Sequence, residues 1–129
     1  MAVIEQETKH RRPHPHSLSG PFLEFDLVRE VDQLQREPEW TNGQNAKTLV
    51  KYDDLRIVLT VLKPRKKVPE HQADGGRVSI QGVTGHVLLR AEGRTFDVVP
   101  GRVVTFDRGV AHELEAIEES AILQTIALS

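Results

Sequence analysis

Two histidines, His71 and His112, are the residues best suited to carry chemistry in this chain of 129 residues. Neutral imidazoles bind Zn²⁺, Fe²⁺, Mn²⁺ or Ni²⁺, and the amide oxygen of a glutamine such as Gln81 can add a further ligand. Arg77 and Ser79 precede that glutamine, and a guanidinium matches a carboxylate or phosphate through two parallel hydrogen bonds. These five residues are therefore candidates for a divalent metal site or for a small-ligand site.

Several other kinds of chemistry are absent from the sequence. There is no cysteine, which excludes disulfides, thiolate metal ligands and cysteine nucleophiles. The formal net charge is −2 with both signs interspersed, so the basic stripe that is typical of nucleic-acid binding is missing. No nucleophile elbow, phosphate loop or dinucleotide fingerprint occurs. Because no segment reaches the length of a signal peptide or a membrane span, we expect a cytoplasmic protein without membrane partners.

The chain divides into three parts. Residues 1–20 are charged, histidine-rich and poor in apolar side chains, and we expect a flexible arm. Residues 21–45 contain a helical pattern that follows the N-cap candidate Asp26 and ends at Pro38, and a linker completes this part. Trp40 is expected to anchor the helix to the body of the protein.

From residue 46 to residue 129 the apolar period changes from helical to two, which is typical of strands. Glycines and prolines separate the runs at turn-like spacing, and no helix long enough for a parallel crossover lies between them. The pattern therefore predicts an all-β, antiparallel sandwich or barrel domain. The expected strands are Ala46–Tyr52, Leu55–Lys63, Arg77–Val83, His86–Ala91, Thr95–Val99, Val103–Asp107, His112–Ala116 and Ala121–Ala127.

The segment from Gly101 to His112 resembles the second sequence motif of the cupins. In that family a glycine is followed by five residues, a proline, one residue, a glycine, two residues and a metal-binding histidine. Both glycines, Gly101 and Gly109, and His112 stand at these intervals, while Asp107 takes the place of the proline.

The first cupin motif is recognisable in a reduced form. It reads His-x-His, a short loop, a glutamate, six residues and a glycine. His71 matches the second histidine and Gly85 the glycine, but Pro69 stands at the first histidine, and the glutamate position falls on Arg77 or Val78. The strand 78–81 is also similar to one in small bacterial cupins. The resemblance covers residues 46–127 and implies a small single-domain cupin, an antiparallel jelly-roll β-barrel after a short N-terminal helix.

Strand alternation offers two arrangements for the pocket. If Arg77 faces the barrel interior, Ser79 and Gln81 face it too, beside the two histidines, while Val78 and Ile80 face outward. We expect this phase, with a partner subunit covering the outward apolar residues in a homodimer. The opposite phase buries Val78 and Ile80 and leaves a drier interior.

Three functions are compatible with these residues. The first is a metal-dependent enzyme acting on a small organic molecule, with His71, His112 and Gln81 as ligands. The second is a metal-independent module that binds or senses a small anion through Arg77 and Ser79. The third is a structural dimeric cupin without catalysis. His86, and the pair Glu113 and Glu115, are interpreted as structural or solvated residues.

Overall fold

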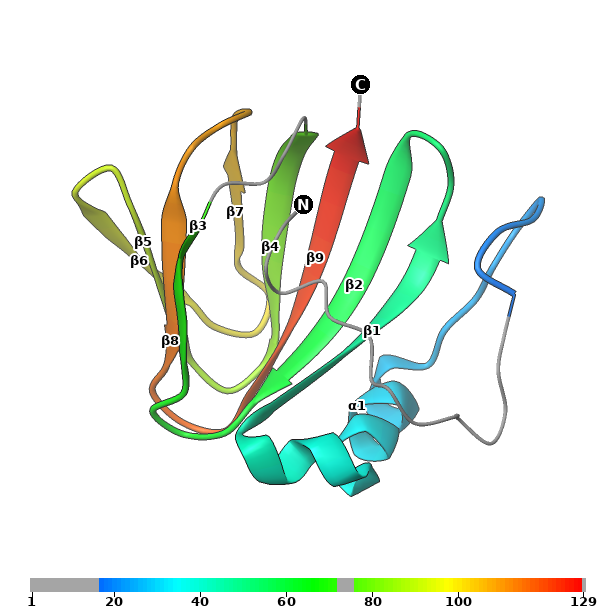
Figure 1. Ribbon diagram of the computed structural model, residues 1–129, viewed down its shortest axis with the longest axis horizontal. Helices are drawn as coiled ribbons and strands as arrows, with labels where there is room; N and C mark the ends of the chain where they lie inside the picture. Colours follow the sequence, from blue (N-terminus) through cyan, green and yellow to red (C-terminus); the bar gives the residue numbers. More distant parts are fainter. Residues whose placement is uncertain (1–16, 72–75, 129) are drawn as a thin grey trace.

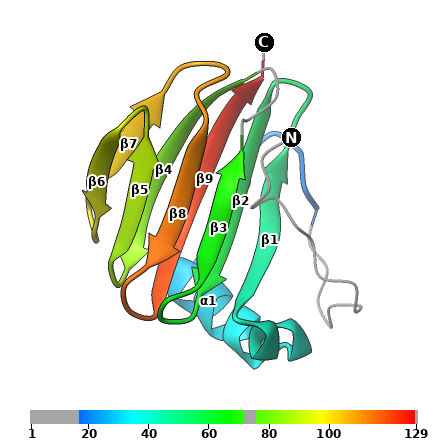
Figure 2. The same cartoon turned by 60° about the vertical axis from the view of Figure 1, so that its left-hand side comes forward.

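The computed structural model describes residues 17–71 and 76–128, and of His71 only the backbone. Most of the expected arm, residues 1–16, lies outside the described residues. Two β-sheets face each other, and the helix α1 packs beside one of them (Figure 1, Figure 2). Within the described residues no helix is both long and apolar enough to cross a membrane.

Within the same residues a five-stranded sheet has the order β1-β2-β9-β4-β7, and a four-stranded sheet has the order β3-β8-β5-β6. Every pair of neighbouring strands in these sheets is antiparallel. The elements are α1 (Leu27–Arg36), a 3₁₀ helix (Pro38–Asn42), β1 (Gln44–Lys51), β2 (Leu55–Leu62), β3 (Lys67–His71), β4 (Gly76–Thr84), β5 (Val87–Ala91), β6 (Arg94–Val98), β7 (Val103–Phe106), β8 (His112–Ala116) and β9 (Ser120–Leu128). The expected all-β antiparallel jelly roll is confirmed.

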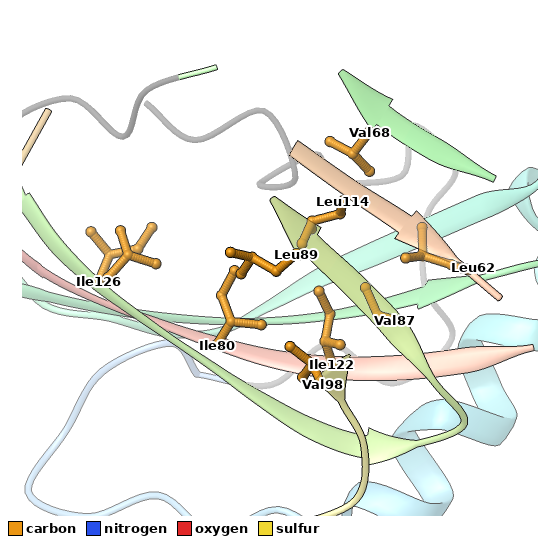
Figure 3. Close-up of a cluster of buried hydrophobic side chains, with 11 residues drawn as sticks. Leu62, Val68, Ile80, Val87, Leu89, Val98, Leu114, Ile122 and Ile126 are labelled. Atoms are coloured by element: carbon orange, nitrogen blue, oxygen red, sulfur yellow. The ribbon is translucent and has the colours of Figure 1, made fainter. Parts of the chain in front are cut away.

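The main core lies between the two sheets. Ile80 and Ile122 from the five-stranded sheet meet Leu89 and Leu114 from the four-stranded sheet, and all four are fully or almost fully buried (Figure 3). Alternation explains the pattern, since every second residue of a strand faces the opposite sheet. We call the side of each sheet that faces the other sheet its inner face.

A second apolar cluster covers the outer face of β1 and β2. Asp26 caps α1 by accepting hydrogen bonds from the backbone N–H groups of Val28 and Arg29, as expected from its position. Leu34 of the helix is buried against Leu49, Leu59 and Val61. Trp40 packs against the same cluster, and the Nζ atom of Lys63 lies 5.3 Å from its ring centroid. The expected role of this tryptophan as an anchor is confirmed.

A buried ion pair also fixes the helix to the sheet. Lys47 Nζ donates to Glu30 Oε1 over 2.7 Å, and the Lys47 side chain is only 5% exposed. Asn45 donates from Nδ2 to the Leu34 carbonyl and to the Glu37 carboxylate, each over 2.9 Å. The outer face of β1 therefore carries polar groups that are paired by the helix above them.

The strand β3 was not among the expected elements. It contains Pro69, and proline cannot donate a backbone hydrogen bond to a sheet ladder. In the structure β3 is an edge strand that pairs with β8 alone, and its register shifts between Val68 and His71. An edge position with an irregular ladder is where a strand tolerates proline.

The expected phase of β4 is wrong. Val78 is 1% and Ile80 0% exposed, and both belong to the core between the sheets, whereas Arg77 and Gln81 are exposed. The two apolar residues therefore need no cover from a partner subunit. The prediction of a homodimer therefore no longer has this support. It stays a prediction, which light scattering would test.

Candidate functional site

His112 lies inside the barrel at the start of β8 and is fully buried. Its Nδ1 is 3.1 Å from the carbonyl oxygen of Val110, and because a carbonyl only accepts, Nδ1 is the donor. In the neutral ring the lone pair then resides on Nε2, the nitrogen able to accept a hydrogen bond or to ligate. The ring packs against Phe106 with a centroid distance of 4.4 Å.

The turn before His112 is held by Asp107. This residue closes a turn in which the Val110 N–H donates to its carbonyl over 3.4 Å, and Gly109 has a positive φ of 75°. The Asp107 carboxylate also accepts from Arg77 Nε over 3.0 Å. The N–H of Arg108 and then the charge of Arg77 hold the pKa of Asp107 below its usual value. The proline of the cupin motif is thus replaced by a residue whose side chain accepts hydrogen bonds from the Arg108 N–H and from Arg77.

The backbone register places His71 opposite His112 in the β3–β8 ladder. On its other edge β8 pairs with β5, and His112 is opposite Ala91. The two histidines predicted from the sequence are therefore cross-strand partners.

The other three predicted site residues do not join them inside the barrel. The Arg77 side chain is 55% exposed and pairs with Asp107 at the outer surface. Ser79 and Gln81 alternate with the buried Val78 and Ile80, so they face away from the core. The structure therefore does not bring Gln81 to His112 as a third ligand.

A glutamine that the sequence analysis did not single out lies inside instead. Gln124 of β9 is fully buried, between the core residues Ile122 and Ile126 on the same face. It is paired in the ladder with Val58 of β2 and with Ile80 of β4. The sequence signal was a polar residue within the apolar alternation of the last strand.

Two threonines stand on the inner face near Gln124 on the β1–β2 side, next to its ladder partner Val58. Thr48 is the partner of Val58 in the ladder, and Thr60 follows Val58 on the inner face of β2. Both threonines are buried. Toward the end of the barrel where His112 lies, the next inner-face residue of β2 is Arg56, which is paired with Ile126.

Arg56 belongs to the same row of cross-strand partners as Phe106, whose ring packs against His112. This row runs from Arg56 through Ile126 and Val78 to Phe106 across the five-stranded sheet. The Nε atom of Arg56 is buried although the residue as a whole is partly exposed. The arginine on an inner face is therefore Arg56 and not the predicted Arg77.

Residues on the outer faces form surface ion pairs. Arg90 contacts Glu115 over 2.9 Å and Glu113 over 3.9 Å, so both glutamates, which are partly exposed, form ion pairs on the outer face of β8. His86 Nε2 lies 2.8 Å from Asp97 Oδ1 on a partly exposed surface. The Ser120 hydroxyl bonds to the backbone of His86 and not to its ring, so these residues do not form a catalytic triad.

Solved structures with the same arrangement of strands were found. A cupin superfamily protein from Desulfitobacterium hafniense has a TM-score of 0.64 at 18% identity, covering 68% of this chain and 80% of that one. The chain has the cupin fold. A conserved protein of unknown function from Streptococcus pyogenes has a TM-score of 0.70 at 19% identity, covering 92% and 98%. A variant of salicylate 1,2-dioxygenase from Pseudoaminobacter salicylatoxidans has a TM-score of 0.73 at 13% identity, covering 88% and 37%.

These likenesses establish the cupin fold alone. No protein-family profile matches the chain, and no curated protein matches it in sequence.

The described residues do not fit the usual metal centre of a cupin, which the sequence resemblance gives as three histidines and one glutamate. Pro69 stands at the position of one histidine, and Arg77 or Val78 at that of the glutamate, and none of these side chains can ligate a metal ion. Within the described part of the chain, no three His, Cys, Asp or Glu side chains gather as a metal site would require. A two-histidine site at His71 and His112 for Zn²⁺, Fe²⁺, Mn²⁺ or Ni²⁺ stays a prediction.

Proposed function

We propose that this cupin-fold protein binds a small organic molecule inside its barrel, between His112 and Gln124, without a metal ion. The observation that carries the proposal is the pair of fully buried polar side chains on inner faces that are otherwise mainly apolar. Burying polar groups is costly unless they are paired, and a few such groups among apolar side chains are what orients a small molecule in a binding site.

The geometry of His112 supports a role in recognition. Val110 and Phe106 fix the orientation of the ring, and Nε2 can then accept a hydrogen bond from a ligand. The surrounding core supplies the apolar contacts that bury most of a small molecule. Among the chains of similar fold, one is named for its action on salicylate, a small organic molecule.

A ligand screen tests the proposal. We expect ligand-observed NMR with a library of small polar molecules to find binders whose dissociation constant rises at least tenfold in His112→Gln. His86→Gln is the matched control, because His86 is partly exposed on the outer surface. A screen without binders, or binders that ignore His112→Gln in a variant shown to be folded, would overturn the proposal.

Metal analysis distinguishes this proposal from the predicted metal site at His71 and His112. Protein prepared without an affinity tag is measured for bound metal before and after reconstitution. Near-stoichiometric metal that is lost in His112→Gln would replace the metal-free proposal with the two-histidine metal site. Metal below about a tenth of an equivalent after reconstitution would support the metal-free form.

A further inference from the structure

Gln124 is an unusual residue for a barrel core. Among the residues that the structure describes, neither its Oε1 nor its Nε2 has a hydrogen-bond partner, and the residue is 0% exposed. Most buried polar atoms in proteins are paired, so an unpaired amide calls for a specific explanation. The Gln124 amide offers one donor group and one acceptor to whatever enters the barrel.

Arg56 lies near Gln124 on the inner face of the same sheet. It is paired with Ile126, two residues after Gln124 on the same strand, so the two residues are diagonal neighbours on one inner face. Diagonal positions in an antiparallel pair are about 7–8 Å apart, a gap that long side chains span. A guanidinium has five N–H donors, so a contact of Arg56 with the protein leaves further donors for a ligand.

The two side chains together define a ligand chemistry. A carboxylate matches the forked guanidinium through two parallel, charge-assisted hydrogen bonds. A hydroxyl on the adjacent carbon can donate to Gln124 Oε1 or accept from Nε2. The carboxylate would then lie nearer the end of the barrel where Arg56 is partly exposed, and the hydroxyl would lie deeper, beside the fully buried Gln124.

We propose that the barrel binds a small 2-hydroxycarboxylate, with Arg56 holding the carboxylate and Gln124 the hydroxyl. This inference rests on the proposed function and specifies its ligand class. It assigns to Arg56 the role in anion binding that the sequence predicted for Arg77, because Arg56 occupies the inner face and Arg77 the outer surface.

The test uses lactate, mandelate and malate as probes, with lactamide and mandelamide as uncharged counterparts. Dissociation constants are measured by ligand-observed NMR on the whole chain. We expect at least one hydroxy acid to bind, and its amide to bind at least tenfold more weakly. Arg56→Gln should weaken the acid at least tenfold, whereas Arg36→Gln, a control at an exposed arginine on α1, should change it less than twofold.

Gln124→Leu provides a second measurement that does not require a ligand. Removing the unpaired amide should raise the melting temperature of the free protein by about 3 °C or more, because the new side chain is apolar and of similar size. The same variant should weaken the hydroxy acid at least tenfold. A lower melting temperature would show that the amide is already satisfied in the free protein and would overturn its assignment to a ligand.

The outcomes separate this inference from the proposed function. Hydroxy acids that bind equally well to Arg56→Gln, or amides that bind as well as acids, would overturn the inference. Binders from the general library that depend on His112, together with no bound hydroxy acid, would overturn it too and leave the proposed function standing. A complete absence of ligands would overturn both.

Discussion

Arg77 Nε donates to Asp107 Oδ1 over 3.0 Å, which connects the beginning of β4 to the turn that leads into His112. Both side chains are largely exposed, so the pair contributes little to stability at neutral pH. Its main effect is to hold the turn in which the cupin motif usually has a proline.

Stability should depend on pH through Asp107. Since its folded pKa is lowered from 3.8, the carboxylate stabilises the fold above that value, and the contribution is lost as the pH falls through the lowered pKa. Asp107→Asn should lower the melting temperature at pH 7 by a few degrees at most. The difference in melting temperature between this variant and the unaltered protein should disappear in acid, which thermal melts from pH 7 to pH 2 would measure.

The control for this prediction is Asp32→Asn. Asp32 pairs with Arg36 on the exposed side of α1, so the change removes one carboxylate far from the turn. A melting-temperature gap for Asp107→Asn that widens in acid would contradict a lowered pKa for the Asp107 carboxyl in the folded protein.

The phase of β4 is open to a direct test. Ile80→Ala should lower the free energy of unfolding by about 2–5 kcal/mol, because it leaves a cavity in the core between the sheets. Gln81→Ala, at the next position but on the exposed face, should change it by less than about 0.5 kcal/mol. Urea denaturation measures both, and similar losses for the two variants would contradict the observed phase.

Comparing alanine substitutions at Gly85 and Gly93 measures how much stability is lost when a side chain is added where two backbone segments lie close together. Both have a φ of 76°, but a Cβ on Gly85 would overlap the Glu119 carbonyl oxygen, whereas one on Gly93 would meet nothing within 4 Å. Gly93→Ala should cost about 1–2 kcal/mol for its backbone conformation alone. Gly85→Ala should cost about 1–3 kcal/mol more, since the chain must shift. Equal losses in urea denaturation would argue against the close contact.

Replacing either partner of the ion pair between α1 and β1 should destabilise the protein, but by different amounts. Glu30→Gln leaves the Lys47 ammonium, only 5% exposed, without its carboxylate, and should destabilise the protein by about 3 kcal/mol. Lys47→Met removes the charge while keeping most of the volume, and should cost less than half as much. Urea denaturation of the two variants and of the double variant gives the coupling energy, and a larger loss for Lys47→Met would contradict the argument.

Local patterns in the chain were enough to predict most of the secondary structure and the location of His112. Period-two alternation with glycine and proline breaks is a local property, and so is the capping of α1 by Asp26, which is why these expectations agree with the structure. The spacing from Gly101 to His112 is local as well, and the histidine is buried inside the barrel. The strand β3 was missed because Pro69 is tolerated only through its edge position, which depends on the partner strand.

Which polar side chains face the interior depends on how the two sheets pack, and local patterns could not predict it. An alternating strand such as β4 can bury either face, and the choice depends on which surface the opposite sheet covers. Both faces of β2 carry apolar residues, because the helix covers one face and the second sheet covers the other. Alternation along β2 therefore did not mark Arg56 as an inner-face residue. The backbone register therefore pairs His71 with His112, while Arg56 and Gln124, and not Arg77 and Gln81, stand on the inner face of the five-stranded sheet.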